Sequence, residues 1–115
     1  MTMERFDSTR RVVCREALGT LPDAEGRRFR EVFRHGSLLV EIYAPVGRDP
    51  QTPHTRDEVY IVIAGSGTFV IDQGRSRFGP GDFLFAPAGV VHRFEDFSED
   101  FAVWVLFYGP EGGER

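Results

Sequence analysis

From Phe29 onward the sequence is a series of short alternating segments that end in glycine or proline, and this feature constrains the fold most. Such segments, rich in Val, Ile, Leu, Phe and Tyr, predict β-strands joined by tight turns. A parallel α/β fold needs a helical crossover between strands, and the intervals after residue 29 are too short for one. The pattern therefore predicts an all-β barrel or sandwich, with strands expected at 29–34, 37–43, 58–63, 68–71, 76–78, 83–86, 92–94 and 101–108.

The rest of the 115-residue chain is expected to complete a single domain, residues 1–115. Residues 1–28 are polar and charged and form an N-terminal arm, in which 14–21 predicts one short helix stopped by Pro22. Residues 29–108 form the barrel, and 68–71 is expected to pair with 58–63 as a hairpin across Gly65 and Gly67. The tail, 109–115, is expected to be frayed.

Composition excludes several classes of partner. The net charge is −4, so the chain has no electrostatic footprint for nucleic acid or an anionic membrane surface. No apolar run is long enough to span a membrane, and the mixed charge of residues 1–5 predicts no signal peptide. The single cysteine, Cys14, is consistent with a reducing compartment and predicts a cytoplasmic protein. There is no lysine, so Schiff-base chemistry on a lysine is excluded.

Three side chains are candidate metal ligands. Glu58 and Tyr60 share one face of a predicted strand, and His54 joins that face if the extended chain reaches back to it. His92 begins another short strand after a turn at Pro87. Imidazole and carboxylate on the inner wall of a barrel suit a divalent metal. Taken from spacing alone, a surface histidine and a surface glutamate at a strand end would give the same pattern.

Two segments resemble the conserved motifs of the cupin family. Residues 81–92, with Asp96 after them, resemble the second cupin motif, which carries glycine, proline, glycine, histidine and a final asparagine at this spacing. Only the last position departs, since Asp96 replaces asparagine. The end of the first motif is matched by Glu58 and Gly65, with His54 where its second histidine belongs. The place of its first histidine holds Thr52.

The resemblance implies a cupin double-stranded β-helix, that is, a jelly-roll barrel, which holds one divalent metal ion such as Fe, Zn, Mn or Ni. It implies His54, Glu58 and His92 as ligands. Thr52 is a poor ligand for the fourth place, which the neighbouring Gln51 amide or a water molecule could take. The resemblance also implies a homodimer.

Three functions remain open for such a barrel, because a fold does not fix a function. The first is a metalloenzyme of the oxygenase type on a small organic molecule, since two histidines and one carboxylate match the facial triad of non-haem iron oxygenases. The second is a sugar-phosphate isomerase or epimerase, and the third is a module that binds a metal or small ligand without turnover. Glu58 and Tyr60 are the candidate catalytic residues, and Glu41 is either a general acid or base near the metal or an exposed strand carboxylate.

Overall fold

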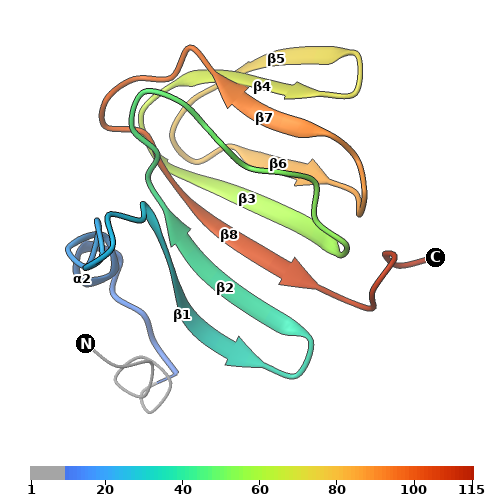
Figure 1. Cartoon of the computed structure of the whole chain (residues 1–115), viewed down its shortest axis with the longest axis horizontal. Coiled ribbons are helices and arrows are strands. Elements are labelled where there is room, and N and C mark those ends of the chain that lie inside the picture. Colours follow the sequence, from blue (N-terminus) through green and yellow to red (C-terminus); the bar gives the residue numbers. More distant parts are fainter. Residues whose placement is uncertain (1–9) are drawn as a thin grey trace.

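The computed structural model describes residues 10–115, which form one short helix and eight strands (Figure 1). The elements are α2 (Cys14–Leu18), β1 (Phe29–His35), β2 (Leu38–Tyr43), β3 (Asp57–Ala64), β4 (Gly67–Ile71), β5 (Gly74–Phe78), β6 (Phe83–Ala86), β7 (His92–Glu95) and β8 (Ala102–Tyr108). The predicted all-β class with a short N-terminal helix is confirmed. The first part of the arm, including the segment used to predict the absence of a signal peptide, lies outside the described residues.

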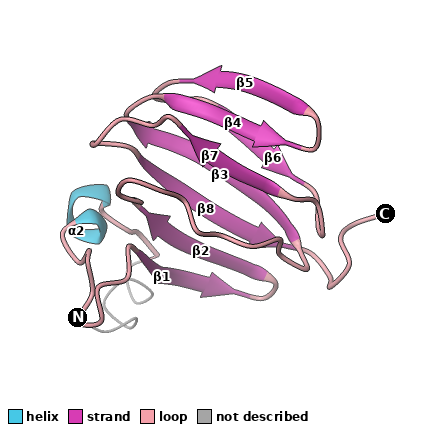
Figure 2. Cartoon of the chain, turned by 45° about the horizontal axis from the view of Figure 1, so that its top comes forward, coloured by secondary structure: helices cyan, strands magenta, loops and turns pink. Residues whose placement is uncertain are grey.

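The strands form two antiparallel sheets that face each other as a jelly roll (Figure 2). The larger sheet has the order β1-β2-β8-β3-β6, and the smaller has the order β5-β4-β7. The two strands that carry the second motif thus lie in different sheets, β6 beside β3 and β7 beside β4. This arrangement places the end of the second motif opposite the start of β3.

The predicted hairpin between β3 and β4 is wrong. β3 pairs with β6 and β8, whereas β4 pairs with β5 and β7, so the chain changes sheets at Gly65. Gly65 has φ +85°, and a Cβ there would lie 2.6 Å from the Cα of Phe101. Only glycine tolerates both the backbone conformation and this close approach. The glycines that suggested a hairpin turn therefore form a corner between the sheets.

The space between the sheets holds the main core, in which aromatic side chains dominate. The alternation predicted for β3 is confirmed, because Glu58, Tyr60 and Val62 are 1%, 0% and 2% exposed. Tyr60 packs edge-on against Phe94, with ring centroids 4.8 Å apart. Rings that pack in this way fix one another's orientation. The Tyr60 hydroxyl is consequently held at one place in the interior.

A second, smaller core lies on the outer face of the larger sheet, where α2 covers β2. Ala17 of the helix packs with Val32 and Ile42, all 0% exposed. The helix is shorter than predicted and ends at Leu18, where the chain turns at Gly19. Because α2 buries the outer face of β2, the inner face of that strand is free to point its alternate side chains toward the site.

The C-terminal tail is not frayed, in contrast to the expectation. The carboxylate of Asp57 accepts hydrogen bonds from the backbone N–H groups of Ala88 (3.0 Å) and Glu114 (2.8 Å). The N–H of Gly112 also donates to the carbonyl of Thr55, at 2.7 Å. These bonds tie the tail and the β6–β7 turn to the start of β3. Within residues 10–115, no helix is long and apolar enough to cross a membrane.

Candidate metal site

The candidate ligands meet between the two sheets. Glu58 lies at the start of β3 in the larger sheet, and His92 begins β7 in the smaller sheet. Glu58 Oε1 lies 3.0 Å from His92 Nε2, and both side chains are 1% exposed. Glu58 and His92 are far apart in the sequence. They form a pair only because the jelly roll places β3 and β7 face to face.

His54 approaches the same carboxylate from the connection between β2 and β3. Its Nε2 lies 4.0 Å from Glu58 Oε2, and its side chain is 38% exposed. The ring packs edge-on against Phe107 with centroids 4.8 Å apart, and its backbone carbonyl accepts a 2.7 Å hydrogen bond from Gly89 N. The structure therefore brings His54, Glu58 and His92 together, as the motif predicts, with His54 on the solvent side.

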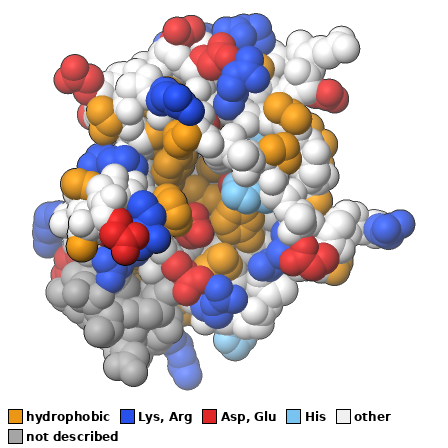
Figure 3. Space-filling view, in the orientation of Figure 1, with side chains coloured by type: hydrophobic (Ala, Val, Ile, Leu, Met, Phe, Trp, Pro, Cys, Tyr) orange, Lys and Arg blue, Asp and Glu red, His pale blue; other side chains and the backbone are white. Residues whose placement is uncertain are grey.

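A cavity of about 180 Å³ opens beside these residues. Figure 3 shows a hollow on this face of the molecule with apolar side chains inside it and carboxylates and a histidine at its edge. The cavity is lined by Phe29, Glu41, Tyr43, Pro50, Gln51, His54, Glu58, Val105 and Phe107. It is smaller than the range of about 300–1,000 Å³ typical of ligand pockets, so it suits a small molecule.

A chain of hydrogen bonds fixes the side chains behind the ligands. Asp49 Oδ2 accepts from Gln51 Nε2 at 2.6 Å, so the other atom of the amide, Gln51 Oε1, faces Tyr60. Gln51 Oε1 accepts from the Tyr60 hydroxyl at 2.8 Å. The same hydroxyl lies 2.8 Å from His92 Nε2. Because the hydroxyl has one proton, it can donate to only one of these two acceptors.

The proton positions leave Glu58 Oε1 without a donor. His92 Nδ1 lies 2.9 Å from the carbonyl of Val90, which can only accept, so Nδ1 carries the proton of the neutral ring. Nε2 of the neutral ring is then a lone pair that faces the carboxylate. Among the described residues Glu58 Oε1 has no hydrogen-bond partner, whichever acceptor takes the Tyr60 proton. A buried carboxylate in this position calls for a positive charge, either a metal ion or a proton on Nε2.

The pKa values of His92 and Tyr60 are both raised, in agreement with this accumulation of negative charge. Burial alone lowers the pKa of His92, but the adjacent Glu58 carboxylate and the Val90 carbonyl outweigh burial and raise it. Burial and then the charge of Glu58 raise the pKa of Tyr60 well above its usual value, so the metal-free protein holds Tyr60 as the phenol. Both shifts favour the forms that carry a proton beside Glu58.

The donor set fits a divalent cation, although the site is not closed around one. Two ligands of one Zn²⁺ ion lie roughly 3–3.5 Å apart. The contact between His92 and Glu58 meets this spacing, and the contact between His54 and Glu58 is longer. In the part of the chain that the structure describes, no three His, Cys, Asp or Glu side chains are arranged closely enough to enclose a metal ion. Closure therefore requires the partly exposed His54 ring to move toward Glu58.

Gln51 and Thr52, the two candidates for the place of the missing histidine, lie differently. Gln51 lines the cavity, but its amide oxygen is engaged by Tyr60, whereas Thr52 is exposed. Gln51 as a metal ligand stays a prediction. Arg56, a possible alternative partner of Glu58, instead donates from Nε to the carbonyl of Gly109 at 3.0 Å. Among residues 10–115, Glu58 is therefore paired only with His54 and His92 and with no arginine.

Two residues of the site had no clear sequence signal. Asp49 accepts from the Tyr43 hydroxyl, from Gln51 and, at 2.8 Å, from Phe94 N of β7, so it ties the β2–β3 connection to the smaller sheet. It lies in an irregular segment where periodicity says nothing. Glu41 lines the cavity and is half-buried, so it is not an exposed strand carboxylate, and its role as a general acid or base stays a prediction. Its β2 position allowed either face, and only the cover supplied by α2 settles which one.

The fold and the site together define a class: a small jelly-roll barrel with a candidate single-metal site of two histidines and one carboxylate at its open end. Comparison with known proteins then gives the family. The model of the family described as "Cupin domain" matches residues 39–108, more than half of the chain. The chain belongs to the cupin family.

Two curated relatives match part of this chain. An uncharacterized protein of Streptomyces coelicolor, SCO3923, is 35% identical over 85 residues, which cover 72% of this chain and 81% of that protein. The dimethylsulfoniopropionate lyase DddQ of Ruegeria pomeroyi is 33% identical over 70 residues, 59% of this chain. The match covers only 35% of that lyase.

Solved structures agree with the fold. The crystal structure of DddQ superposes with a TM-score of 0.64 and 28% identity, covering 76% of this chain and 50% of that one. A cupin-2 domain protein of Shewanella frigidimarina superposes with a TM-score of 0.68 over 89% of this chain and 98% of that one. Its identity of 14% supports the jelly-roll fold alone.

Proposed function

We propose that this protein is a metal-dependent enzyme that performs proton-transfer chemistry on a small organic molecule, with elimination as the reaction type best supported. One observation carries the proposal: Tyr60 Oη, Glu58 Oε1 and His92 Nε2 converge in a buried site where, within residues 10–115, Glu58 Oε1 has no hydrogen-bond partner. The relative DddQ, named as a lyase, supports the reaction type. The ligands in this proposal are His54, Glu58 and His92.

A divalent ion held by these three side chains would act as a Lewis acid on a carboxylate or carbonyl oxygen of the substrate. The Tyr60 hydroxyl lies within hydrogen-bond reach of His92 Nε2. Its oxygen can therefore exchange a proton with a substrate that binds beside this ring. In an elimination, the Tyr60 oxygen, ionised beside a bound divalent cation, would take the proton from the carbon next to the substrate carboxylate. The electron pair of that C–H bond becomes the second bond of a C=C group, and the leaving group departs from the next carbon with its bonding pair.

The other chain groups hold Tyr60 in place. Gln51 Oε1 accepts a hydrogen bond from the Tyr60 hydroxyl, and Asp49 fixes the orientation of the Gln51 amide. A proton at Tyr60 therefore has a defined acceptor whether or not a ligand is present. The surrounding rings keep water from the interior part of the site, which strengthens each of these polar contacts.

Oxygenase chemistry is a second candidate. Two imidazoles and one carboxylate with open positions match the facial triad used by non-haem iron oxygenases. The sugar-phosphate alternative has less support, because none of the arginines that could anchor a phosphate lines the cavity. Those arginines bond elsewhere: Arg56 to the Gly109 carbonyl, Arg75 and Arg93 to Glu95, and Arg77 to Thr68. The implied homodimer stays a prediction; exposed Phe83 on β6, 63% exposed, is consistent with it.

The first test is metal content. Untagged protein is purified and analysed for metals as the wild type, as His92→Ala and as Glu99→Gln, a control that removes an exposed carboxylate far from the cavity. We expect one equivalent of a divalent metal in the wild type and in the control, and loss of that metal in His92→Ala. Protein that holds no metal and takes none up on titration would refute the proposal.

The second test separates the two reaction types. The metal-loaded protein is incubated anaerobically and in air with a panel of small carboxylates, including dimethylsulfoniopropionate. Each carries a leaving group on its β-carbon, the carbon after the one that loses the proton. Elimination gives an alkene product by NMR without oxygen, whereas an oxygenase turns over only in air with Fe(II). Tyr60→Phe is expected to keep its metal and to lower turnover by roughly 10²–10⁴-fold. Metal uptake without turnover on any substrate would favour the binding-module alternative.

A further inference from the structure

The cavity beside the candidate metal site has an unusual electrostatic make-up. Among its lining residues are two carboxylates, Glu41 and Glu58, and the rings of Phe29, Tyr43 and Phe107. None of the arginines in the described part of the chain, residues 10–115, lines it, and the sequence contains no lysine. The cavity therefore presents negative charge and aromatic surface to whatever enters it.

We propose that this cavity binds a small organic cation, such as a quaternary ammonium group, with Glu41 as its counter-ion and the three aromatic rings as its walls. This inference names the substrate class for the proposed function. It rests on that function only because both place the substrate in the same cavity. A bound metal would take up the charge of Glu58, which leaves Glu41 as the group that selects the charge of the substrate.

Glu41 is available for that role because no cationic side chain among residues 10–115 pairs with it. It lies on β2 opposite Val105 of β8 and Glu31 of β1. Within residues 10–115, no hydrogen bond or ion pair joins Glu41 to another group, and burial and then the charges of Glu58 and Glu31 raise its pKa to about 7. Glu41 is half-buried, and a partly desolvated carboxylate that lines a ligand cavity without a paired cation favours a cationic ligand.

The walls suit a cation that carries methyl groups. Aromatic faces attract cations through the ring quadrupole, most strongly where water is excluded. The hydroxyl of Tyr43 is already bonded to Asp49, so Tyr43 offers its ring to the cavity and no free donor. Phe107 is held by the edge-on contact with His54. With a volume of about 180 Å³, the cavity has room for a compact headgroup and a short carbon chain.

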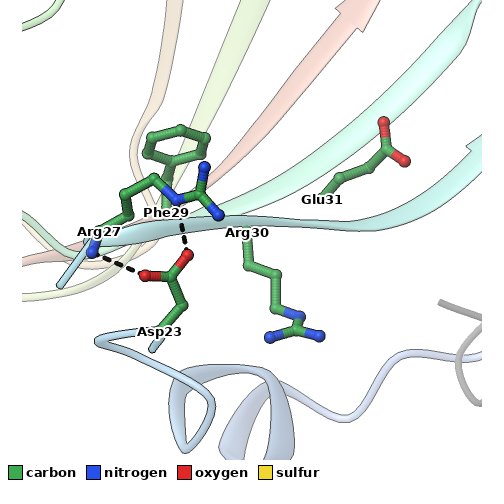
Figure 4. A pocket seen from close by; sticks show the side chains of 5 residues that line it. All are labelled: Asp23, Arg27, Phe29, Arg30 and Glu31. Atoms are coloured by element: carbon green, nitrogen blue, oxygen red, sulfur yellow. Dashed lines mark hydrogen bonds and ion pairs between the residues drawn. The ribbon is translucent and has the colours of Figure 1, made fainter. Parts of the chain in front are cut away.

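The Phe29 ring already contacts a cation, the guanidinium of Arg27, outside the cavity. Phe29 also lines a separate open groove of about 370 Å³ between the arm and β1. In that groove the guanidinium carbon of Arg27 lies 5.9 Å from the centre of the Phe29 ring, and Figure 4 shows Arg27 tied to Asp23. The Arg27–Asp23 bond is 2.6 Å long and Glu25 lies 3.5 Å away, so the arginine is paired and gives the cavity no anion site.

The test compares two ligands of the same shape and different charge. Choline and its neutral carbon analogue, 3,3-dimethylbutan-1-ol, are titrated by calorimetry into metal-loaded and EDTA-treated protein at pH 8, with inorganic phosphate as an anionic probe. We expect choline to bind at least tenfold more tightly than the neutral analogue, roughly as one unscreened charge predicts. Glu41→Gln, checked for folding by circular dichroism, is expected to remove that preference and to leave binding of the neutral analogue unchanged. Glu99→Gln, the control with the same loss of charge, is expected to behave as the wild type.

Equal binding of the two ligands, tighter binding of phosphate, or an undiminished preference in Glu41→Gln would each overturn the inference. Its failure is distinguishable from failure of the proposed function. A choline preference that depends on Glu41 in protein unable to bind metal would support the cation site and refute the metalloenzyme. Metal uptake and turnover without a charge preference would do the reverse.

Discussion

Asp49 is expected to be the residue outside the ligand set on which the site depends most. Its carboxylate accepts four hydrogen bonds: three short ones, from the Tyr43 hydroxyl, from Gln51 Nε2 at 2.6 Å and from Phe94 N at 2.8 Å, and a longer one from Gln51 N at 3.4 Å. Bonds to a charged acceptor contribute roughly 1.5–3 kcal/mol each, and partial exposure of Asp49 places them at the low end. With the three short bonds counted at that low end, Asp49→Ala should lower the free energy of unfolding by about 4–5 kcal/mol. The control is Asp82→Ala, which removes one exposed bond from Gly79 N and should cost below about 1 kcal/mol.

The assay is urea denaturation of metal-free protein, followed by circular dichroism and extrapolated to zero denaturant. Asp49→Asn, which keeps the shape and one acceptor oxygen, should fall between the wild type and Asp49→Ala. Metal affinity measured on the same variants should fall with them, because Gln51 loses the partner that orients it toward Tyr60. An Asp49→Ala protein as stable as Asp82→Ala would refute the reasoning, since it would show that the β2–β3 connection is held by other contacts.

Three further outcomes follow from the geometry. Gly65→Ala should cost roughly 3 kcal/mol or more, whereas Gly26→Ala, which has a similar φ of +82° and nothing within 4 Å, should cost about 1 kcal/mol; equal losses in urea would show that the close approach at Gly65 is unimportant. His92 has a raised pKa in the folded protein, so the EDTA-treated protein should be most stable below the ordinary histidine pKa of about 6.5 and lose stability as the pH rises through the higher folded value. Glu58→Gln should flatten that profile, and an unchanged profile would contradict the pairing. Glu41→Gln should stabilise the protein by roughly 1–2 kcal/mol at pH 8 and not at pH 4, because the pKa of about 7 means that ionised Glu41 is disfavoured by the fold; a less stable variant at pH 8 would contradict this.

The strands were predictable because the alternation that marks each one lies within a few consecutive residues. Alternation placed Glu58 and Tyr60 on the inner face of β3, and the structure buries both. Pairing between strands was less accessible, as the β3–β4 error shows. Glycines that end one strand and begin another fit a hairpin or a corner equally well. What decides is the approach of Phe101 to Gly65, a contact made by a segment far along the chain.

The groups that orient the ligands were not predictable for the same reason. Asp49 acts on Phe94, and Asp57 acts on Ala88 and Glu114, across distances in sequence that no local pattern spans. Both lie in or beside irregular segments, where a carboxylate ordinarily faces solvent. A motif thus predicts the spacing of the candidate ligand residues. The hydrogen bonds that hold those residues depend on which loops the fold brings together.

The two departures from the cupin motifs have different physical meanings, and this difference bears on function. Asp96 replaces asparagine at a position with φ +51°, a conformation that aspartate and asparagine both tolerate, so this change preserves the turn after β7. Thr52 replaces a histidine ligand, and its side chain is exposed, while the neighbouring Gln51 occupies the inner position and bonds to Tyr60. The first change is conformational and neutral to the site. At the second, a neutral amide that bonds to the Tyr60 phenol lies where the cupin pattern has a histidine, so the proposed metal site would keep an open position beside a positioned hydroxyl.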